Sequence, residues 1–306
     1  MSGMKRTLLR QVAVVLILIA TISAFVYYFA THPEVRQQLA QIPPFTLLVL
    51  LLLYLLSVLV LGLTFNATLR LCRLSLNISE TALLTAYSSV INFFGPLQSG
   101  PAFRAVYLKQ KYRLSVTQYS LATIVYYIFF GTFSGLFLLS GILGWWLIAL
   151  IGGLLIGAYL ISRHPKVAPR VKLLALGNWY YLAAATLAQV LVVALIYYIE
   201  LNSVSPGIEV SQALIYTGAA NLALFVSITP GAIGFREAFL LFTQNLHNVD
   251  ASTIVAASII DRAMYIVLML ILGLFIIATH AKKKLVVKDE VLEDKRVDTD
   301  NHTGSK

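Results

Sequence analysis

The chain has 306 residues, of which 59% are hydrophobic and only 12% charged, and its formal net charge is +10. A soluble protein is about 25% charged, so this composition excludes a soluble globular class. Apolar runs of about 20 residues recur, which is the length that crosses a bilayer as a helix. We therefore predict an all-α polytopic membrane protein, whose basic charge indicates cytoplasmic loops and anionic lipid as partners, with no nucleic acid.

Six apolar runs are long enough to be full spans. The first follows Lys5, Arg6 and Arg10, and a signal peptide is the alternative interpretation for that run. Cys72 is the only cysteine, so no intrachain disulfide can form. The six predicted spans are residues 11–30, 45–66, 117–139, 145–161, 177–200 and 253–279.

Two further apolar segments, residues 80–113 and 211–250, are interrupted by proline and glycine. The residues that break their helices are Pro96, Pro101, Pro230 and Gly231. Residues 102–112 would form only about 16 Å of helix, roughly half the hydrocarbon thickness. We therefore predict two re-entrant helical hairpins rather than extra pairs of crossing helices.

The order span, broken segment, span occurs twice, in residues 45–139 and 177–279. The first copy begins outside and the second inside, which predicts an inverted-topology repeat. Chance Gly/Pro breaks in an ordinary helical bundle are the alternative. Residues 1–280 are predicted to form a single transmembrane domain, and the polar segment 281–306 a disordered cytoplasmic tail.

The loops divide by charge and so predict an orientation. Residues 109–113 and 162–172 carry clusters of Lys and Arg, whereas residues 200–210 on the opposite side carry Glu200 and Glu209. The positive-inside rule then places both termini in the cytoplasm. We predict a multi-pass protein of the cytoplasmic (inner) membrane.

Each broken segment restarts a helix close to an arginine, which predicts an anion site. Ser99-Gly100-Pro101 and Thr229-Pro230-Gly231 are typical of helix starts, and a helix that begins inside the membrane aims unpaired N–H groups at its surroundings. Arg104 and Arg236 follow within about a turn, and an arginine fork matches phosphate or carboxylate oxygens. The alternative is that both side chains snorkel to the headgroups and the glycines only permit tight helix packing.

Three more ionisable residues, Glu237, Asp261 and Arg262, are expected within the membrane, where charges normally face a bundle interior or a wet cavity. Three arginines against two carboxylates leave one positive charge for an anionic ligand to balance. Structural Glu237–Arg262 or Asp261–Arg pairs are the alternative. The candidate substrate-binding residues are Asn92, Gly100, Arg104, Asn221, Gly234, Arg236, Glu237, Asp261 and Arg262.

Two of these residues, Asn92 and Asn221, also have a structural interpretation, and two tyrosines are expected near the site. Asn92 and Asn221 precede the breaks and are expected to bond backbone groups that the interruptions free. Tyr126 and Tyr127 occupy the position in the first copy that Asp261 and Arg262 hold in the second. They line the same cavity in one interpretation and serve helix packing in the other.

Nothing in the sequence predicts an enzyme. The five histidines have no metal-ligand spacing, and there is no nucleophile elbow, P-loop or dinucleotide fingerprint. We predict no catalytic residue, no metal and no cofactor.

The quoted residues resemble a known family. Its pattern is matched by Asn92, Pro96, Gly100, Arg104 and Tyr107-Leu108-Lys109, then by Pro230-Gly231-x-x-Gly234-x-Arg236-Glu237, and by the pair Asp261-Arg262. The chain thus resembles the lysylphosphatidylglycerol synthase transmembrane-region family, which are flippase-like integral membrane proteins. The resemblance covers roughly residues 10–280, without the synthase domain. It implies binding or movement of a lipid with a phosphate-containing headgroup, and no synthase activity.

Residues and resemblance together predict a flippase-like transporter that binds an anionic phospholipid headgroup at the membrane midplane, between the two broken helices. One alternative is a non-transporting membrane subunit that delivers lipid to a separate synthase or glycosyltransferase. Another is an intramembrane enzyme acting on a lipid phosphate, which the lack of paired catalytic histidines or carboxylates disfavours. The expected partners are membrane lipids and, in the first alternative, a separate lipid-modifying enzyme.

Overall fold

The computed structural model describes residues 40–94, 99–163, 178–226 and 234–303, together with residues 33, 37 and 232. This part of the chain consists of helices and their connections, with no strand in it. The predicted span 11–30 and the break residues Pro96, Pro230 and Gly231 lie outside it.

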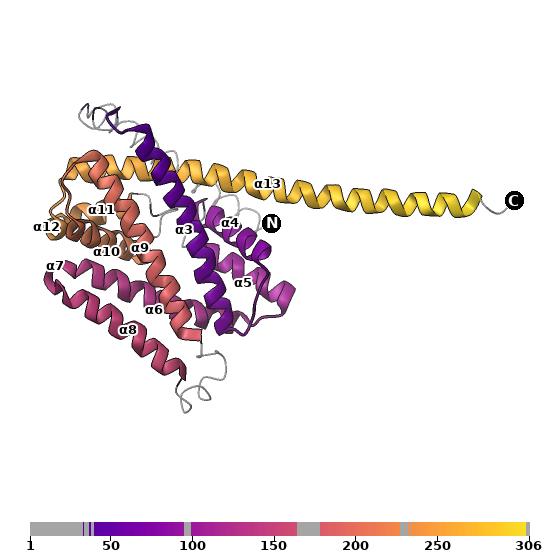
Figure 1. Cartoon of the computed structure of the whole chain (residues 1–306), viewed down its shortest axis with the longest axis horizontal. Helices are drawn as coiled ribbons and strands as arrows, with labels where there is room; N and C mark the ends of the chain where they lie inside the picture. The colour runs from indigo at the N-terminus through magenta and orange to yellow at the C-terminus, as the bar shows by residue number, and fades with distance from the viewer. Residues whose placement is uncertain are drawn as a thin grey trace, which may run out of the picture.

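Figure 1 shows the helices gathered in one bundle, beyond which α13 extends. The helices are α3 (Pro44–Leu71), α4 (Ile78–Phe94), α5 (Ser99–Tyr112), α6 (Val116–Leu138), α7 (Ser140–Leu143), α8 (Trp146–Arg163), α9 (Trp179–Val204), α10 (Val210–Val226), α11 (Phe235–Phe242), α12 (Gln244–His247) and α13 (Ala251–Thr303). The backbone of α13 is helical through most of the segment 281–306, where the sequence predicts disorder. Lys, which favours helices, is the most frequent residue there.

Four helices are long and apolar enough to cross a membrane. They are Pro44–Leu71, Val116–Leu138, Trp179–Val204 and Ala251–Thr279, and they coincide with four of the predicted spans. The chain is therefore an all-helical integral membrane protein. The predicted span 145–161 corresponds to α8, whose apolar part, Trp146–Leu160, is shorter. Six full crossings stay a prediction.

Helix α3 illustrates how the sequence produces a membrane helix. Pro44 lies in the first turn, where the missing N–H of proline removes no intrahelical hydrogen bond. No charged residue follows until Arg70. Leu59 and Leu63 are 66% and 63% exposed on one face, whereas Leu50 on the other is fully buried. The exposed leucines form a face for lipid rather than for water.

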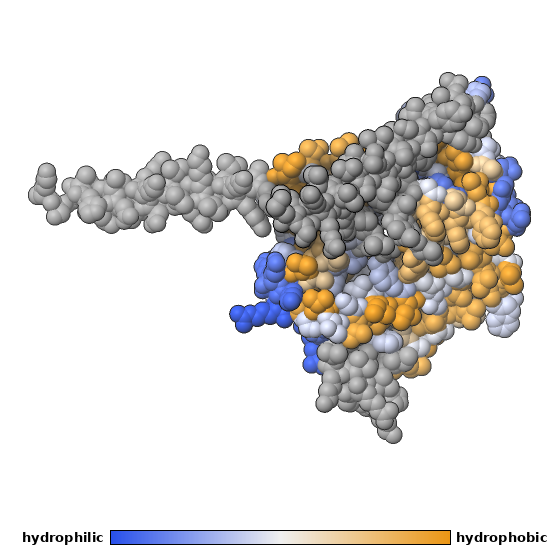
Figure 2. Space-filling view, turned by 180° about the vertical axis from the view of Figure 1, so that it is seen from behind, coloured by the Kyte–Doolittle hydropathy of each residue, from blue (hydrophilic) through white to orange (hydrophobic). Residues whose placement is uncertain are grey.

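The described surface as a whole has the same character. Figure 2 shows a broad hydrophobic band, with hydrophilic residues gathered toward its two ends. Apolar side chains such as Ile148 on α8 and Leu274 on α13 are more than half exposed. A soluble monomer rarely exposes a contiguous apolar patch above a few hundred Å², so the band is expected to lie in the bilayer.

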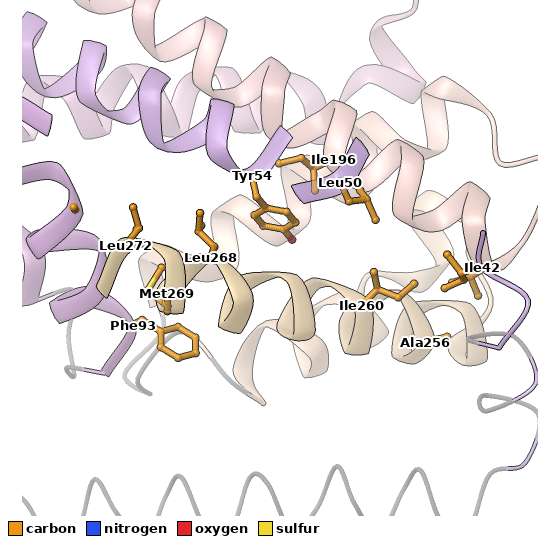
Figure 3. Packing of buried hydrophobic residues seen from close by; sticks show 12 residues of the cluster. Ile42, Leu50, Tyr54, Phe93, Ile196, Ala256, Ile260, Leu268, Met269 and Leu272 are labelled. Atoms are coloured by element: carbon orange, nitrogen blue, oxygen red, sulfur yellow. The ribbon is translucent and has the colours of Figure 1, made fainter. Parts of the chain in front are cut away.

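The largest group of buried hydrophobic residues joins α3, α4, α9 and α13. It includes Leu50 and Tyr54 of α3, Phe93 of α4, Ile196 of α9 and Leu268 of α13. Figure 3 shows the Tyr54 ring among these aliphatic side chains, with its hydroxyl directed toward α13. A polar atom therefore enters the core, and its partners belong to the candidate site.

The broken segment 80–113 forms two helices, α4 and α5, that pack on each other. At their far end, the Glu80 carboxylate accepts hydrogen bonds from the hydroxyls of Tyr107 and Tyr112, both at 2.6 Å, and from Lys111 Nζ at 2.9 Å. Burial raises the pKa of Glu80, but the three donors outweigh it and hold the pKa below its ordinary value. Glu80 therefore fastens the end of α5 to α4 as a carboxylate.

Helix packing repeats between the group α3–α6 and the group α9–α13. In the first group α3 packs on α4, α4 on α5, and α5 on α6. In the second group the corresponding pairs are α9 with α10, α10 with α11, and α11 with α13. Contacts between the two groups follow the same correspondence. Helix α4 contacts α13 as α10 contacts α6, and α3 contacts α13 as α9 contacts α6. The two broken segments therefore occupy equivalent places in the bundle.

One expectation about a helix end is wrong. Helix α9 continues to Val204, so Glu200 lies within a helix and not in a loop outside the membrane. It is only 1% exposed. Tyr197, Glu200, Leu201 and Val204 follow a helical spacing and are all buried, so packing against neighbouring helices extends α9 past the point where the apolar run ends.

Candidate functional site

A cavity of about 300 Å³ lies between the two broken segments and is lined by residues of eight helices. Seven of the nine candidate binding residues line it: Asn92, Gly100, Arg104, Asn221, Arg236, Asp261 and Arg262. Gly234 and Glu237 do not, although Glu237 contacts two arginines that do. The chain therefore brings the arginines of both broken segments to one cavity.

The first broken segment holds its second helix by backbone contacts. Helix α5 begins at Ser99, whose hydroxyl donates to the carbonyl of Ile91 at 3.1 Å. Asn92 Oδ1 accepts a hydrogen bond from the backbone N–H of Gly100 at 3.4 Å, as the sequence predicts. A Cβ atom at Gly100 would lie 2.6 Å from the carbonyl oxygen of Ser88. Glycine is therefore required for α5 to approach α4 this closely.

Arg104, one turn further along α5, is a buried cation that has no acidic partner among the described residues. It is 9% exposed, its Nε donates to Ser88 Oγ at 2.7 Å, and its guanidinium carbon lies 4.3 Å from the centre of the Phe65 ring. It forms no ion pair with a carboxylate in the described ranges. Such a charge costs several kcal/mol to bury, and a desolvated cation–π contact offsets about 2 kcal/mol or more of that cost. The side chain lines the cavity instead of snorkelling outward.

The second broken segment starts its helix differently. Helix α11 begins at Phe235, and Gly234 before it has φ of 78°, a left-handed conformation that glycine adopts without strain. Glu237 Oε2 accepts the backbone N–H of Gly234 at 2.8 Å. A carboxylate of the chain therefore occupies the positive end of this helix. The predicted start at Thr229-Pro230-Gly231 lies outside the described residues.

Arginines of the second segment and of α13 have carboxylate partners. Arg236 Nη2 lies 2.5 Å from Asp261 Oδ2 and 3.4 Å from Glu237 Oε1, and Arg262 Nη2 lies 2.8 Å from Glu237 Oε1. The four side chains are at most 14% exposed. The ion pairs given as the structural alternative are therefore present. They match two cations with two anions and hold Arg236 and Arg262 in place.

Three further polar residues that the sequence analysis singled out, Asn221, Tyr126 and Tyr127, are part of the lining. Asn221 is 2% exposed, and its Nδ2 has no hydrogen-bond partner within the described structure. Residues 227–231, which contain the interruption, lie outside the described residues, so the expected bond of Asn221 to freed backbone groups stays a prediction. Tyr126 and Tyr127 both line the cavity, as one interpretation of the sequence predicts. The Tyr126 hydroxyl pairs with the Gln189 amide, at 3.2 Å from Nε2.

Sequence reasoning missed Tyr54 and Glu200. The Tyr54 hydroxyl oxygen lies 2.5 Å from Asp261 Oδ1 and 2.9 Å from Glu200 Oε1. Tyr54 lines the cavity, whereas Glu200 does not. The available signal for Glu200 was its position three residues after Tyr197, on the same helical face. The signal for Tyr54 was that it is a lone tyrosine in the apolar run of α3.

The cavity therefore combines two kinds of polar group. One is Arg104, a cation for which the described residues supply no counter-charge. The other is a network of ion pairs that continues from Asp261 through the Tyr54 hydroxyl to the buried carboxyl of Glu200. Such a site can attract and orient an anion by charge and by hydrogen bonds.

Comparison with known proteins gives one match. No curated protein and no solved structure matches the chain. The family model described as "Lysylphosphatidylglycerol synthase TM region" matches residues 11–273, which is most of the chain and includes both broken segments. The chain therefore belongs to the lysylphosphatidylglycerol synthase transmembrane-region family.

Proposed function

We propose that the cavity binds the phosphate of an anionic lipid and that the protein moves this lipid between the two leaflets. The observation that carries the proposal is Arg104, a buried guanidinium on the cavity wall for which the described chain supplies no carboxylate. Buried charges are normally paired. A phosphate oxygen would pair with this one through the geometry that a guanidinium favours.

The size and lining of the cavity fit a headgroup better than a whole lipid. Ligand sites commonly measure about 300–1,000 Å³, and this cavity, at about 300 Å³, is at the lower end. The headgroup would lie beside Arg104 and Asn221, whose Nδ2 has no hydrogen-bond partner among the described residues, and the acyl chains would stay in the surrounding lipid. Arg236 and Arg262, whose charges are already matched, would orient the headgroup rather than attract it.

The arrangement of the bundle supports a transport mechanism. We place segments 80–113 and 211–250 as re-entrant hairpins of an inverted-topology repeat, with residues 11–30 and 145–161 as the spans outside it. The paired helix contacts and the position of both arginine-bearing helices at one cavity support this placement. Transporters with such repeats bind their substrates near the midplane, between broken helices, and alternate access by rocking one repeat against the other.

Reconstitution in liposomes tests the proposal. Fluorescent phosphatidylglycerol in the inner leaflet becomes accessible to a membrane-impermeant quencher only when the protein moves it outward. The wild-type protein should expose it, Arg104→Gln should abolish exposure, and Arg104→Lys should retain part of it. The matched control is Lys109→Gln, which removes an exposed charge from the same helix and should transport normally.

Two outcomes would overturn the transporter assignment. Transport by folded Arg104→Gln at the wild-type rate would show that Arg104 is not the group that binds the phosphate. Binding of the lipid without movement would favour a membrane subunit that delivers lipid to a separate enzyme. A parallel measurement with fluorescent phosphatidylcholine distinguishes selection of an anionic headgroup from general scrambling.

A further inference from the structure

The hydroxyl of Tyr54 lies between two carboxyl groups. Its oxygen is 2.5 Å from Asp261 Oδ1 and 2.9 Å from Glu200 Oε1, so both separations are hydrogen bonds. A phenol carries one proton and can donate to only one of them. If both carboxyls were ionised, one contact would place two oxygen lone pairs against each other. One of the two carboxyls must therefore carry a proton of its own.

The surroundings identify Glu200 as the protonated group. Asp261 faces Arg236 in an ion pair, which stabilises its ionised form. Glu200 is 1% exposed, forms no ion pair in the part of the chain that is described, and its second oxygen, Oε2, has no hydrogen-bond partner there. An isolated carboxylate in such a place costs far more than a neutral carboxylic acid. Glu200 therefore donates to Tyr54, which donates to Asp261.

Glu200 reaches the cavity only through this hydrogen-bonded chain. Tyr54 and Asp261 line the cavity, and Glu200 stands next to Tyr54 without lining it. The charged and titratable groups that act on Glu200 come from several elements: Tyr54 of α3, Tyr197 of α9 itself, Tyr216 of α10, Arg236 of α11, and Asp261 and Arg262 of α13. A proton can move between Glu200 and the cavity by exchange through the Tyr54 hydroxyl.

The proton on Glu200 decides the net charge around the cavity. With Glu200 neutral, three arginines (Arg104, Arg236 and Arg262) face two carboxylates, Glu237 and Asp261, and the site has one positive charge. With Glu200 ionised, the charges balance and nothing remains for an anion to neutralise. Binding of the proton should therefore raise the affinity for an anion. By linkage, a bound anion raises the affinity of Glu200 for the proton by the same factor.

We propose that Glu200 is a proton-binding site coupled to the anion site, so that one proton is bound and moved together with one anionic headgroup. The step adds a proton from water to the Glu200 carboxylate and returns it when the anion leaves, with no other bond changed. This inference rests on the proposed function, to which it adds a driving force, the transmembrane proton gradient. It also explains why a carboxyl without a cation is kept in the interior.

Binding at different pH values tests the coupling. The probe is a short-chain phosphatidylglycerol, a phosphodiester whose charge is constant from weakly acidic to alkaline pH, titrated into the detergent-solubilised protein. Wild-type affinity should be constant at low pH and then fall with rising pH, by up to about tenfold per unit for one linked proton. Glu200→Gln, which imitates the neutral acid, should bind tightly at every pH. Glu209→Gln, an exposed acid nearby in the chain, should behave as wild type.

A second measurement separates this inference from the proposed function. The infrared spectrum of the wild-type protein, without any lipid, should contain the carbonyl stretching band of a protonated carboxylic acid, and Glu200→Gln should lack it. If the band is absent, the inference fails even where the lipid binds. If the band is present but no anionic lipid binds, the proposed function fails, and the coupling with it. Wild-type binding that does not change with pH while the band titrates would overturn the coupling alone.

Discussion

At the scale of single residues, Arg104 and Arg236 have similar burial but opposite electrostatic surroundings. Arg104 has Ser88 and the Phe65 ring beside it, whereas Arg236 is paired with Asp261. Their replacement by glutamine should therefore affect stability in opposite ways. Arg236→Gln leaves a buried carboxylate without its cation and should destabilise the protein by about 3–5 kcal/mol. Arg104→Gln removes an uncompensated charge and should leave stability unchanged or increase it.

Thermal unfolding of the two variants in the same detergent measures this difference. The unfolding temperature should fall clearly for Arg236→Gln only. A similar fall for both variants would mean that the chain itself supplies a counter-charge to Arg104, which would remove the main support for an anion site. The double variant Arg236→Gln/Asp261→Asn should recover part of the loss, since it leaves no charge of the pair unmatched.

Sequence reasoning worked best for residues that are rare in a membrane. Arg104, Arg236 and Asp261 could be predicted to line a cavity or form ion pairs, as they do, because a charge inside an apolar segment has few other places to lie. Glu200 could not, because its interpretation depended on where the span ends. The apolar run gave no sign that α9 continues for one more turn. The ion pairs of Arg236 and Arg262 were named as the structural alternative. The neighbours of Arg104, Ser88 and Phe65, were not, since they come from other helices.

At the scale of elements, the close contact between α4 and α5 positions Arg104, and Gly100 makes that contact possible. In Gly100→Ala, the new methyl group would meet the backbone carbonyl of Ser88, at 2.6 Å. Neither helix can relieve this clash by rotating a side chain. We expect α5 to move away from α4, at a cost of about 1–3 kcal/mol, and to carry Arg104 out of its position. Lipid transport in liposomes should fall together with the unfolding temperature.

Gly135→Ala is the matched control for this substitution. Gly135 lies within α6, and nothing lies within 4 Å of a Cβ added there. Alanine is favoured over glycine inside a helix by up to about 1 kcal/mol, so this variant should be as stable as wild type or more so. Normal transport by Gly100→Ala would show that the exact approach of α5 to α4 does not matter for the site.

At this scale the sequence predicts that a helix exists better than it predicts the residue at which the helix begins. The Gly/Pro breaks correctly indicate that each segment is divided into separate helices, two in residues 80–113 (α4 and α5) and three in residues 211–250 (α10, α11 and the short α12). The start of α11 at Phe235 depends on Gly234, which adopts a positive φ, and on Glu237, which accepts the Gly234 N–H. These local contacts cannot be distinguished in the sequence from the other Gly and Pro residues of the same stretch.

At the scale of the whole molecule, the two helix groups are alike in packing but not in charge. In the first group, Tyr126 pairs with Gln189 of α9, and in the second, Asp261 meets Tyr54 of α3. At the cavity, the first group therefore contributes Arg104, which has no carboxylate partner among the described residues. The second group contributes the acids Asp261 and Glu200 together with two paired arginines. A transporter built in this way would bind its anion on one repeat and its proton on the other, so that rocking the two repeats would move both.

The predicted orientation can be tested because the chain has a single cysteine that should not react. Cys72 is 5% exposed, and burial raises the pKa of its thiol to about 11, so near neutral pH it carries little of the reactive thiolate. A cysteine introduced at an exposed position should then react alone. In the orientation that the loop charges predict, Lys109→Cys should be labelled by a membrane-impermeant maleimide only from the cytoplasmic side. Glu209→Cys should be labelled only from the opposite side.

Spheroplasts and inside-out vesicles expose the two faces separately, and the wild-type chain measures the background from Cys72. Labelling of both variants from one side would contradict the predicted topology. It would also place the end of α5 and the start of α10 on the same side of the membrane. The two broken segments could then not enter from opposite faces. The inverted repeat, on which the alternating movement depends, would then be lost. Reversed labelling, with Lys109→Cys reacting only from outside, would keep the repeat but place the cytoplasm on the other side of the bundle.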